Sequence, residues 1–351
     1  MRRLSFMARN FLLWALCAPL VAGCGALRVS PPFLGAALDG YPVTQEQAAQ
    51  LGAEFPVPPE IVLFYLQWPA SPEPGGFPGS TLDAIRSTGA IPCLTWEPMY
   101  HTGGREHTVE HRLITNGSYD PYLAAFAAEA KRWGSPFIIR LAHEMNLSRY
   151  HWGTTAEQYG PQSPELYRNM YRHVVDVFRA EGADNVLWAF APNAESVGPS
   201  YDSTAGWNRI ANYYPGSDYV DIMGVDGYNW GDTKTAARDG WESHRRSFGE
   251  LFAAPRRELR KLSRQKPFMV FETASTGERD EKGRWLGEAL AKAEDWGVAG
   301  VVWFQVNKEQ DWRLGRDALP EPPNRLEPGP QQWLAEVLKA ARKPQGHSES
   351  R

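Results

Sequence analysis

The chain has 351 residues, of which 42% are hydrophobic and 22% are charged, and its formal net charge is −4 at pH 7. This length suits one large α/β barrel or two small domains, and the composition is that of an ordinary globular protein. A chain without excess positive charge gives no reason to expect nucleic acid as a partner. The 14 tryptophans are a high number, and indole rings either fill cores or present flat, partly exposed faces to ligands.

The first residues have the pattern of a targeting segment. Three arginines flank the start of an apolar run over 10–21, which is too short for an ordinary membrane span. The run leads into the sequence LVAGC at 20–24, which resembles a bacterial lipobox. The resemblance implies a signal peptide over 1–23, lipidation of Cys24, a short tether over 24–32, and a lipid-anchored protein of the bacterial cell envelope that faces the periplasm or the exterior. A plain signal peptide with an incidental cysteine is the alternative.

Cysteine usage is consistent with this interpretation. Cys17 would leave with the signal peptide and Cys24 would carry lipid, so that Cys93 alone would remain. No intramolecular disulfide is then possible, even in an oxidising compartment. Cys93 lies in an apolar run, and we expect it to be a small buried side chain.

Short apolar runs alternate with longer amphipathic stretches, which is the pattern of repeated βα units. The predicted strands are 33–39, 60–67, 90–96, 136–142, 186–191, 220–226, 267–272 and 299–304. The predicted helices are 44–53, 120–133, 164–180, 243–264, 283–296 and 331–341. Thr44 and Gln47 have the spacing of a capping box, and Asp120 is the expected cap of the second helix.

Eight such units predict a single (β/α)₈ TIM barrel of the α/β class over 33–342, followed by a disordered polar tail over 343–351. A doubly wound sheet is the alternative, but the segment 35–40 after the first strand is not a glycine-rich nucleotide loop. In a barrel the loops after the strands all lie on the catalytic face. The long loops of this kind are 68–80, 97–117, 145–163, 192–206 and 228–240.

Two of the predicted strands deliver a glutamate at their ends. The strand 136–142 runs into the sequence RLAHEMN at 140–146, and the strand 267–272 ends at Glu272. This layout suits glycoside hydrolysis, in which one carboxyl protonates the leaving oxygen while the other attacks or activates water. Alternate strand residues share a side, so Arg140 and Glu144 are in phase, whereas His143 reaches the same site only if the strand bulges or ends there.

Four segments together resemble glycoside hydrolase family 26, the β-mannanases and related endo-glycanases. They are RLAHEMN with a following Trp152-Gly153, DIMGVDGY at 221–228, the strand that ends at Glu272, and VWF at 302–304. The resemblance implies retention of anomeric configuration, with Glu144 as the acid/base and Glu272 as the nucleophile. It also implies that Tyr228 hydrogen-bonds the nucleophile and that Trp303 forms the floor under the sugar at the cleavage point.

The full set of expected substrate-binding residues is Arg140, His143, Asn146, Trp152, Asp226, Tyr228, Trp303, Trp68 and Trp96. We expect no cofactor and no metal. The His143-Glu144 pair lacks the second histidine of a zinc protease, because Leu147 stands at that position. His107 and His111 have a spacing of four residues, but no carboxylate pattern accompanies them.

The sequence therefore predicts a monomeric, retaining endo-β-glycanase of the mannanase type that cleaves a β-linked polysaccharide by double displacement at two glutamates. One alternative is a hydrolase that processes exopolysaccharide, or a transglycosylase, with a different linkage specificity. The alternative from another class is a non-catalytic lipoprotein that binds polysaccharide on the same barrel.

Overall fold

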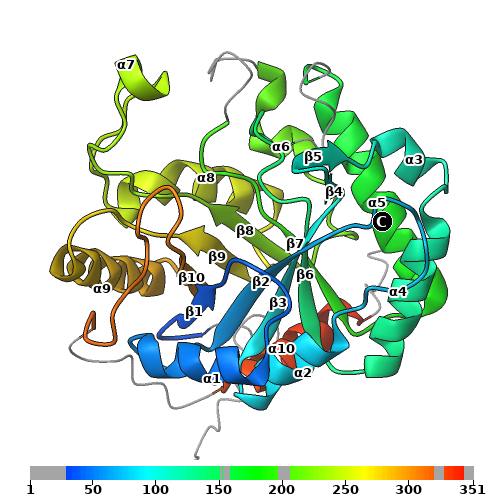
Figure 1. Cartoon of the computed structure of the whole chain (residues 1–351), viewed down its shortest axis with the longest axis horizontal. Helices are drawn as coiled ribbons and strands as arrows, with labels where there is room; N and C mark the ends of the chain where they lie inside the picture. The colour runs from blue at the N-terminus through cyan, green and yellow to red at the C-terminus, as the bar shows by residue number, and fades with distance from the viewer. Residues whose placement is uncertain (1–28, 151, 153–158, 197–205, 320–327, 344–351) are drawn as a thin grey trace, which may run out of the picture.

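The computed structural model describes residues 29–150, 152, 159–196, 206–319 and 328–343 (Figure 1). Cys24, with the expected signal peptide, lies outside the described residues, as does nearly all of the expected tail. In the described part of the chain, no helix is both long and apolar enough to cross a bilayer.

Eight parallel strands close into a barrel, in which each strand pairs with its two neighbours and β1 pairs with β10. In order around the barrel they are β1 (Phe33–Ala37), β2 (Ile61–Gln67), β3 (Ile91–Glu97), β6 (Phe137–Leu141), β7 (Val186–Phe190), β8 (Ile222–Asp226), β9 (Phe268–Thr273) and β10 (Gly300–Phe304). Every predicted strand is present, with its ends displaced by at most about two residues. The predicted (β/α)₈ TIM barrel is confirmed.

Helices surround the barrel, as Figure 1 shows. The longer ones are α1 (Gln45–Glu54), α2 (Gly79–Ser87), α4 (Asp120–Trp133), α5 (Ser163–Glu181), α8 (Phe248–Leu262), α9 (Arg279–Asp295) and α10 (Pro330–Ala341). The short elements are α3 (His111–Thr115), α6 (Ile210–Tyr213), α7 (Ala236–Asp239), the 3₁₀ turn Gly206–Asn208, and a hairpin of β4 (Met99–Thr102) and β5 (Arg105–Thr108). The hairpin and α3 occupy the long loop that follows β3.

The helix starts agree only in part with the sequence. Thr44 caps α1 through the expected capping box with Gln47. The expectation that Asp120 caps α4 is wrong, because Tyr119 is the cap residue and Asp120 is already helical. The Asp120 carboxylate instead lies 2.6 Å from Nε2 of His173, a residue of α5. Asp120 therefore links α4 to α5 and does not cap the start of α4.

Side chains of alternate strand residues form two layers, one inside the barrel and one beneath the helices. Thr95 of β3 faces inward, where its hydroxyl accepts a hydrogen bond from Arg140 Nε at 2.9 Å. Its neighbour Trp96 therefore faces outward, and its ring packs on Phe126 of α4 with centroids 4.4 Å apart. Trp188 of β7 and Trp303 of β10 face outward as well and pack on Phe178 of α5 and Trp285 of α9. Cys93 is buried and free, as expected.

Candidate active site

The chain leaves β6 abruptly. Ala142 and Glu144 both have positive φ angles, 48° and 51°, which are uncommon for residues other than glycine. Each costs about 1–3 kcal/mol and persists where the surroundings hold it, a pattern typical of functional sites. The Glu144 amide is held by the carbonyl of Ala191 at 2.8 Å. Because the backbone no longer alternates, His143 also faces the barrel mouth, and its Nε2 lies 3.9 Å from Oε1 of Glu272.

Glu144 is a buried carboxyl with neutral hydrogen-bond partners. Its side chain accepts a hydrogen bond from Nδ2 of Asn193 at 2.6 Å. Burial and the nearby charge of Glu272 raise the pKa of Glu144 to about 7, although hydrogen bonds from Asn193 and Tyr150 and the charge of Arg140 oppose the rise. A carboxyl of this kind can hold a proton near neutral pH and give it to a substrate.

Glu272 has different partners at the end of β9. Arg140 donates to its Oε1, and the Tyr228 hydroxyl donates to its Oε2 at 2.5 Å. A cation and a hydroxyl donor together stabilise an ionised carboxylate. Burial and the charge of Glu272 raise the pKa of Tyr228 well above its ordinary value, so this hydroxyl keeps its proton. Glu272 is therefore surrounded as an anionic nucleophile would be.

Arg140 of β6 is fully buried, and its side chain contacts residues of β3, β8 and β9. Its Nη1 donates to Oδ2 of Asp226 at 2.7 Å, its Nη2 donates to Glu272, and Thr95 accepts further hydrogen bonds from it. Although burial opposes its charge, Asp226 and Glu272 raise the pKa of Arg140 well above its ordinary value. Arg140 and Asp226 were expected to bind substrate. Both are inaccessible to solvent; Arg140 contacts Glu272 directly, and Asp226 contacts Arg140.

Asn146 was also expected to bind substrate, and the structure gives it another role. Its side-chain oxygen accepts from the Asn193 amide at 2.8 Å, and its Nδ2 donates to the Asn193 carbonyl at 2.9 Å and to Ser196 Oγ at 3.1 Å. The side chain is fully buried. Asn146 therefore fixes the loop after β7, which carries the amide that binds Glu144.

His143 and Trp152 form an aromatic group beside the two glutamates. Trp152 is fully buried, its indole N–H donates to the His143 carbonyl at 2.5 Å, and its ring stacks on Tyr150 with centroids 4.5 Å apart. Burial and the charge of Arg140 lower the pKa of His143 well below its ordinary value, so its ring is neutral. Trp152 therefore packs against both Tyr150 and His143 and presents no open face to a sugar.

Three tryptophans that we expected to contact substrate face away from the barrel mouth. Trp96 lies under α4, and Trp68 packs on it with centroids 4.9 Å apart and 2% exposure. Trp303 packs on Trp285 of α9 with centroids 5.9 Å apart. Phe304, the next residue, packs on Tyr228 instead, with centroids 5.7 Å apart. Strand alternation directs Trp96 and Trp303 into the outer layer, and Trp68, which follows β2, packs there on Trp96, so the structure places none of the three indoles with an open face for a sugar.

Several residues at the site were not found from the sequence. Tyr65 of β2 has its ring 6.1 Å from that of His143 and 5.8 Å from Cζ of Arg140. The others are Asn193, Tyr150, Gln67 and Glu97. Strand phase offered a signal for some of them, because Glu97 follows inward-facing Thr95 by two residues and Gln67 lies beside Glu97 in register. Tyr150 and Asn193 lie in loops, where no periodicity exists to reveal them.

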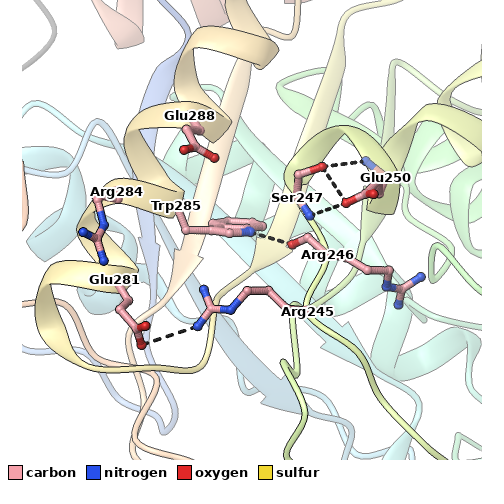
Figure 2. Close-up of a pocket in the computed structure, with 8 residues that line it drawn as sticks. All are labelled: Arg245, Arg246, Ser247, Glu250, Glu281, Arg284, Trp285 and Glu288. Carbon is pink, nitrogen blue, oxygen red and sulfur yellow. Dashed lines mark hydrogen bonds and ion pairs between the residues drawn. The ribbon is translucent and has the colours of Figure 1, made fainter.

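Hollows elsewhere on the surface do not contain this site. One of about 310 Å³ lies between α8 and α9, where Arg245 pairs with Glu281 at 3.4 Å (Figure 2). Arg246, which also lines it, pairs with Glu195 at 2.5 Å, and the hollow includes neither Glu144 nor Glu272. Among the residues that the structure describes, no group of three or more potential metal ligands converges.

A barrel that holds two buried carboxyls with unlike partners, at the ends of β6 and β9, has the arrangement of a two-carboxylate glycoside hydrolase. Residues 104–242 match the family model described as glycosyl hydrolase family 26. This match, over less than half of the chain, shows that the segment carrying Glu144 and Asp226 is similar to that family.

Proteins with curated names match the chain as well. Endoglucanase H of Acetivibrio thermocellus is 35% identical over 234 residues, which are 66% of this chain and 23% of that protein. A mannan endo-1,4-beta-mannosidase of Bacillus subtilis is 29% identical over 154 residues, which are 42% of this chain and 33% of that protein. The chain thus covers no more than about a third of either relative's length.

Solved structures show the same fold. The Bacillus subtilis mannanase BCman matches with a TM-score of 0.59 and 18% identity, over 87% of this chain and 89% of that one. The Bacillus subtilis mannanase man26 matches with a TM-score of 0.58 and 18% identity, over 84% and 86%. At this identity the likeness concerns the barrel alone.

Proposed function

We propose that this protein is a retaining glycoside hydrolase that cleaves internal bonds of a β-linked polysaccharide. The observation that carries the proposal is the difference between two buried glutamates. The pKa of Glu144 is raised to about 7, whereas Glu272 accepts hydrogen bonds from Arg140 and Tyr228. The first suits a proton donor and the second a nucleophile.

In the first step, the ionised Glu272 attacks the anomeric carbon of the sugar while Glu144 gives its proton to the departing glycosidic oxygen. The glycosidic bond breaks, and an ester forms between Glu272 and the sugar. Arg140 and Tyr228 hold the nucleophile in place, and the neutral His143 adds no competing positive charge beside it.

In the second step, Glu144 acts as the base. Once Glu272 is esterified its negative charge is gone, and this charge is one of the causes that raise the pKa of Glu144. The pKa of Glu144 therefore falls, and the resulting carboxylate can take a proton from water as the water attacks the anomeric carbon. Two inversions restore the original β configuration.

For the substrate, we propose a mannan as the first candidate and a β-glucan as its competitor. The names of the relatives support both, because mannan endo-1,4-beta-mannosidases and an endoglucanase match this chain. The endoglucanase shares more residues with the chain, but that protein is about four times longer than the matched part, so its name describes other regions as well.

The test is a panel of mannan, β-glucan and bacterial exopolysaccharides with product analysis and with the anomer of the first product read by NMR. We expect internal cleavage and a β product, lost in Glu144→Gln and Glu272→Gln and kept in Glu165→Gln, an exposed site on α5. An α product would indicate inversion. Products longer than the substrate would indicate a transglycosylase, and binding without cleavage a non-catalytic lipoprotein.

We also propose that the protein is anchored in the cell envelope through lipid on Cys24. The support is the sequence LVAGC at 20–24 after a short apolar run. Cys24→Ser is expected to move the protein from the membrane fraction to the soluble fraction. A wild-type protein that is already soluble, or a variant that stays with membranes, would contradict the proposal.

A further inference from the structure

A third carboxyl lies in the barrel mouth and has no part in the two-glutamate mechanism. Glu97 is the last residue of β3, and its side chain is 4% exposed. It lies in register with Gln67, the last residue of β2, whose Nε2 donates to its Oε2 at 2.5 Å. The two side chains therefore form one hydrogen-bonded pair across two neighbouring strand ends.

The pair faces the site rather than the helices. Glu97 follows the inward-facing Thr95 by two residues, and Thr95 binds Arg140. Burial raises the pKa of Glu97 to about 7, with the charge of Glu272 adding to the rise and those of Arg140 and Lys308 opposing it. The position of Glu97 follows from the strand: it is on the same side of β3 as Thr95, which binds the Arg140 that donates to Glu272.

The local interactions do not satisfy Glu97. A buried carboxyl is normally matched by a cation or by several donors, because burial without partners costs free energy. Among the described residues, Gln67 is the hydrogen-bond partner of Glu97, and no basic side chain forms an ion pair with it. Gln67 is only half buried. A carboxyl and an amide at the mouth of a cleft, with hydrogen-bonding capacity left over, suit a ligand that brings hydroxyl groups.

We propose that Glu97 and Gln67 together bind neighbouring hydroxyl groups of the sugar that becomes attached to Glu272, and so select its configuration. This inference rests on the proposed hydrolase function and extends it from the reaction to the choice of sugar. A site built to hydrogen-bond particular hydroxyls rejects an epimer strongly, because the wrong sugar leaves buried polar groups unpaired. Mannose and glucose differ in one such hydroxyl, which makes them suitable probes.

The experiment compares Glu97→Ala, Glu97→Gln and Gln67→Ala with the wild type on aryl β-glycosides of mannobiose and cellobiose. In these substrates the aryl group is the leaving group, so both sugars belong to the part of the substrate that becomes attached to Glu272. We expect Glu97→Ala to lower kcat/KM for the preferred glycoside on the order of 10²-fold or more and to bring the two sugars' kcat/KM values at least about 10-fold closer together. Gln67→Ala should act in the same direction with a smaller effect.

The ratio between the two sugars is the decisive readout, because a purely structural role would reduce both activities equally. Glu97→Gln keeps the side-chain shape, so it tests the proposal if Glu97→Ala fails to fold, and we expect it to change the ratio as well. Glu165→Gln on α5 is the matched control, because it removes one exposed carboxyl from a helix on the outside of the barrel.

The outcomes separate this inference from the proposed function. An active enzyme whose sugar ratio is unchanged in all three variants would overturn the inference and leave the function standing. A loss on polysaccharide that spares the aryl glycosides would overturn the assignment to the Glu272 side. If the wild type cleaves nothing, calorimetric titration with mannobiose and cellobiose decides: binding that Glu97→Ala abolishes supports the pair as a sugar site, and no binding overturns both proposals.

Discussion

The ends of β6 and β9 each carry a glutamate, with nearly the same exposure, 6% for Glu144 and 5% for Glu272. Their backbones differ, because Glu144 follows the strand with a φ of 51° whereas Glu272 lies within β9. Their partners differ more. Glu144 accepts from the amide of Asn193, and Glu272 accepts from the buried cation Arg140.

This comparison shows that burial alone does not assign a role to a carboxyl. The two carboxyls are almost equally buried, and their hydrogen-bond partners distinguish them. The cation that joins Glu272 to Asp226 reaches Glu144 only through space. Each variant below removes one side of this difference, and the variants run from the largest expected effect to the smallest.

Glu272→Ala removes the carboxyl that we assign as the nucleophile. Turnover of every substrate should fall by a factor on the order of 10⁶, the size of loss seen when the nucleophile of a covalent mechanism is removed. Steady-state rates on polysaccharide and on aryl glycosides measure this. An aryl glycoside that retains ordinary turnover would exclude a covalent intermediate on Glu272.

Glu144→Ala removes the acid/base, and its effect should depend on the substrate. Cleavage of substrates with poor leaving groups should fall by about 10²–10⁴-fold, because those groups need a proton in the first step. An aryl glycoside with a good leaving group should still react and accumulate glycosyl-enzyme, detectable by mass spectrometry.

Added azide should then speed turnover of the Glu144→Ala enzyme and give a β-glycosyl azide, because a small anion fits the vacated space and needs no base. If azide instead restores the activity of Glu272→Ala and gives a β product, the two roles are the reverse of those assigned here.

Tyr228→Phe removes the hydroxyl donor from Glu272 and leaves Arg140 in place. A hydrogen bond to a charged group contributes about 1.5–3 kcal/mol, so kcat/KM should fall by about 10- to 150-fold. The melting temperature serves as a check, since the ring still packs on Phe304 and Trp312. An unchanged kcat/KM would mean that Tyr228 does not stabilise the nucleophile during the reaction.

Asn193→Ala addresses the pKa of Glu144. Glu144 must be protonated in the first step, so kcat/KM of the wild type should fall as pH rises above about 7. The Asn193 hydrogen bond stabilises the ionised form and lowers this pKa, so its loss should move the alkaline limb to higher pH by less than about one unit. A limb that moves to lower pH would contradict the assignment of Glu144 as the acid.

The sequence predicted the barrel because each strand is a short apolar run between amphipathic helices, a signal that depends on local order in the chain. It also indicated that Arg140, Tyr228 and the two glutamates belong together, through a resemblance between segments. Strand periodicity also indicates that neighbours such as Thr95 and Trp96 face opposite sides of the barrel wall. It did not show which of them faces inward, because both sides of a parallel strand are buried.

The sequence by itself determined the closed parallel barrel and the two strands that end in a glutamate, since apolar periodicity and residue order are properties of the chain alone. Only the tertiary structure decided which side chains meet. It directed Trp68, Trp96 and Trp303 into the outer layer, assigned Asn146 to a loop, and paired Glu97 with Gln67. The physical reason is that facing depends on where each strand ends and on the register between neighbouring strands. Both are set by contacts between segments far apart in the sequence.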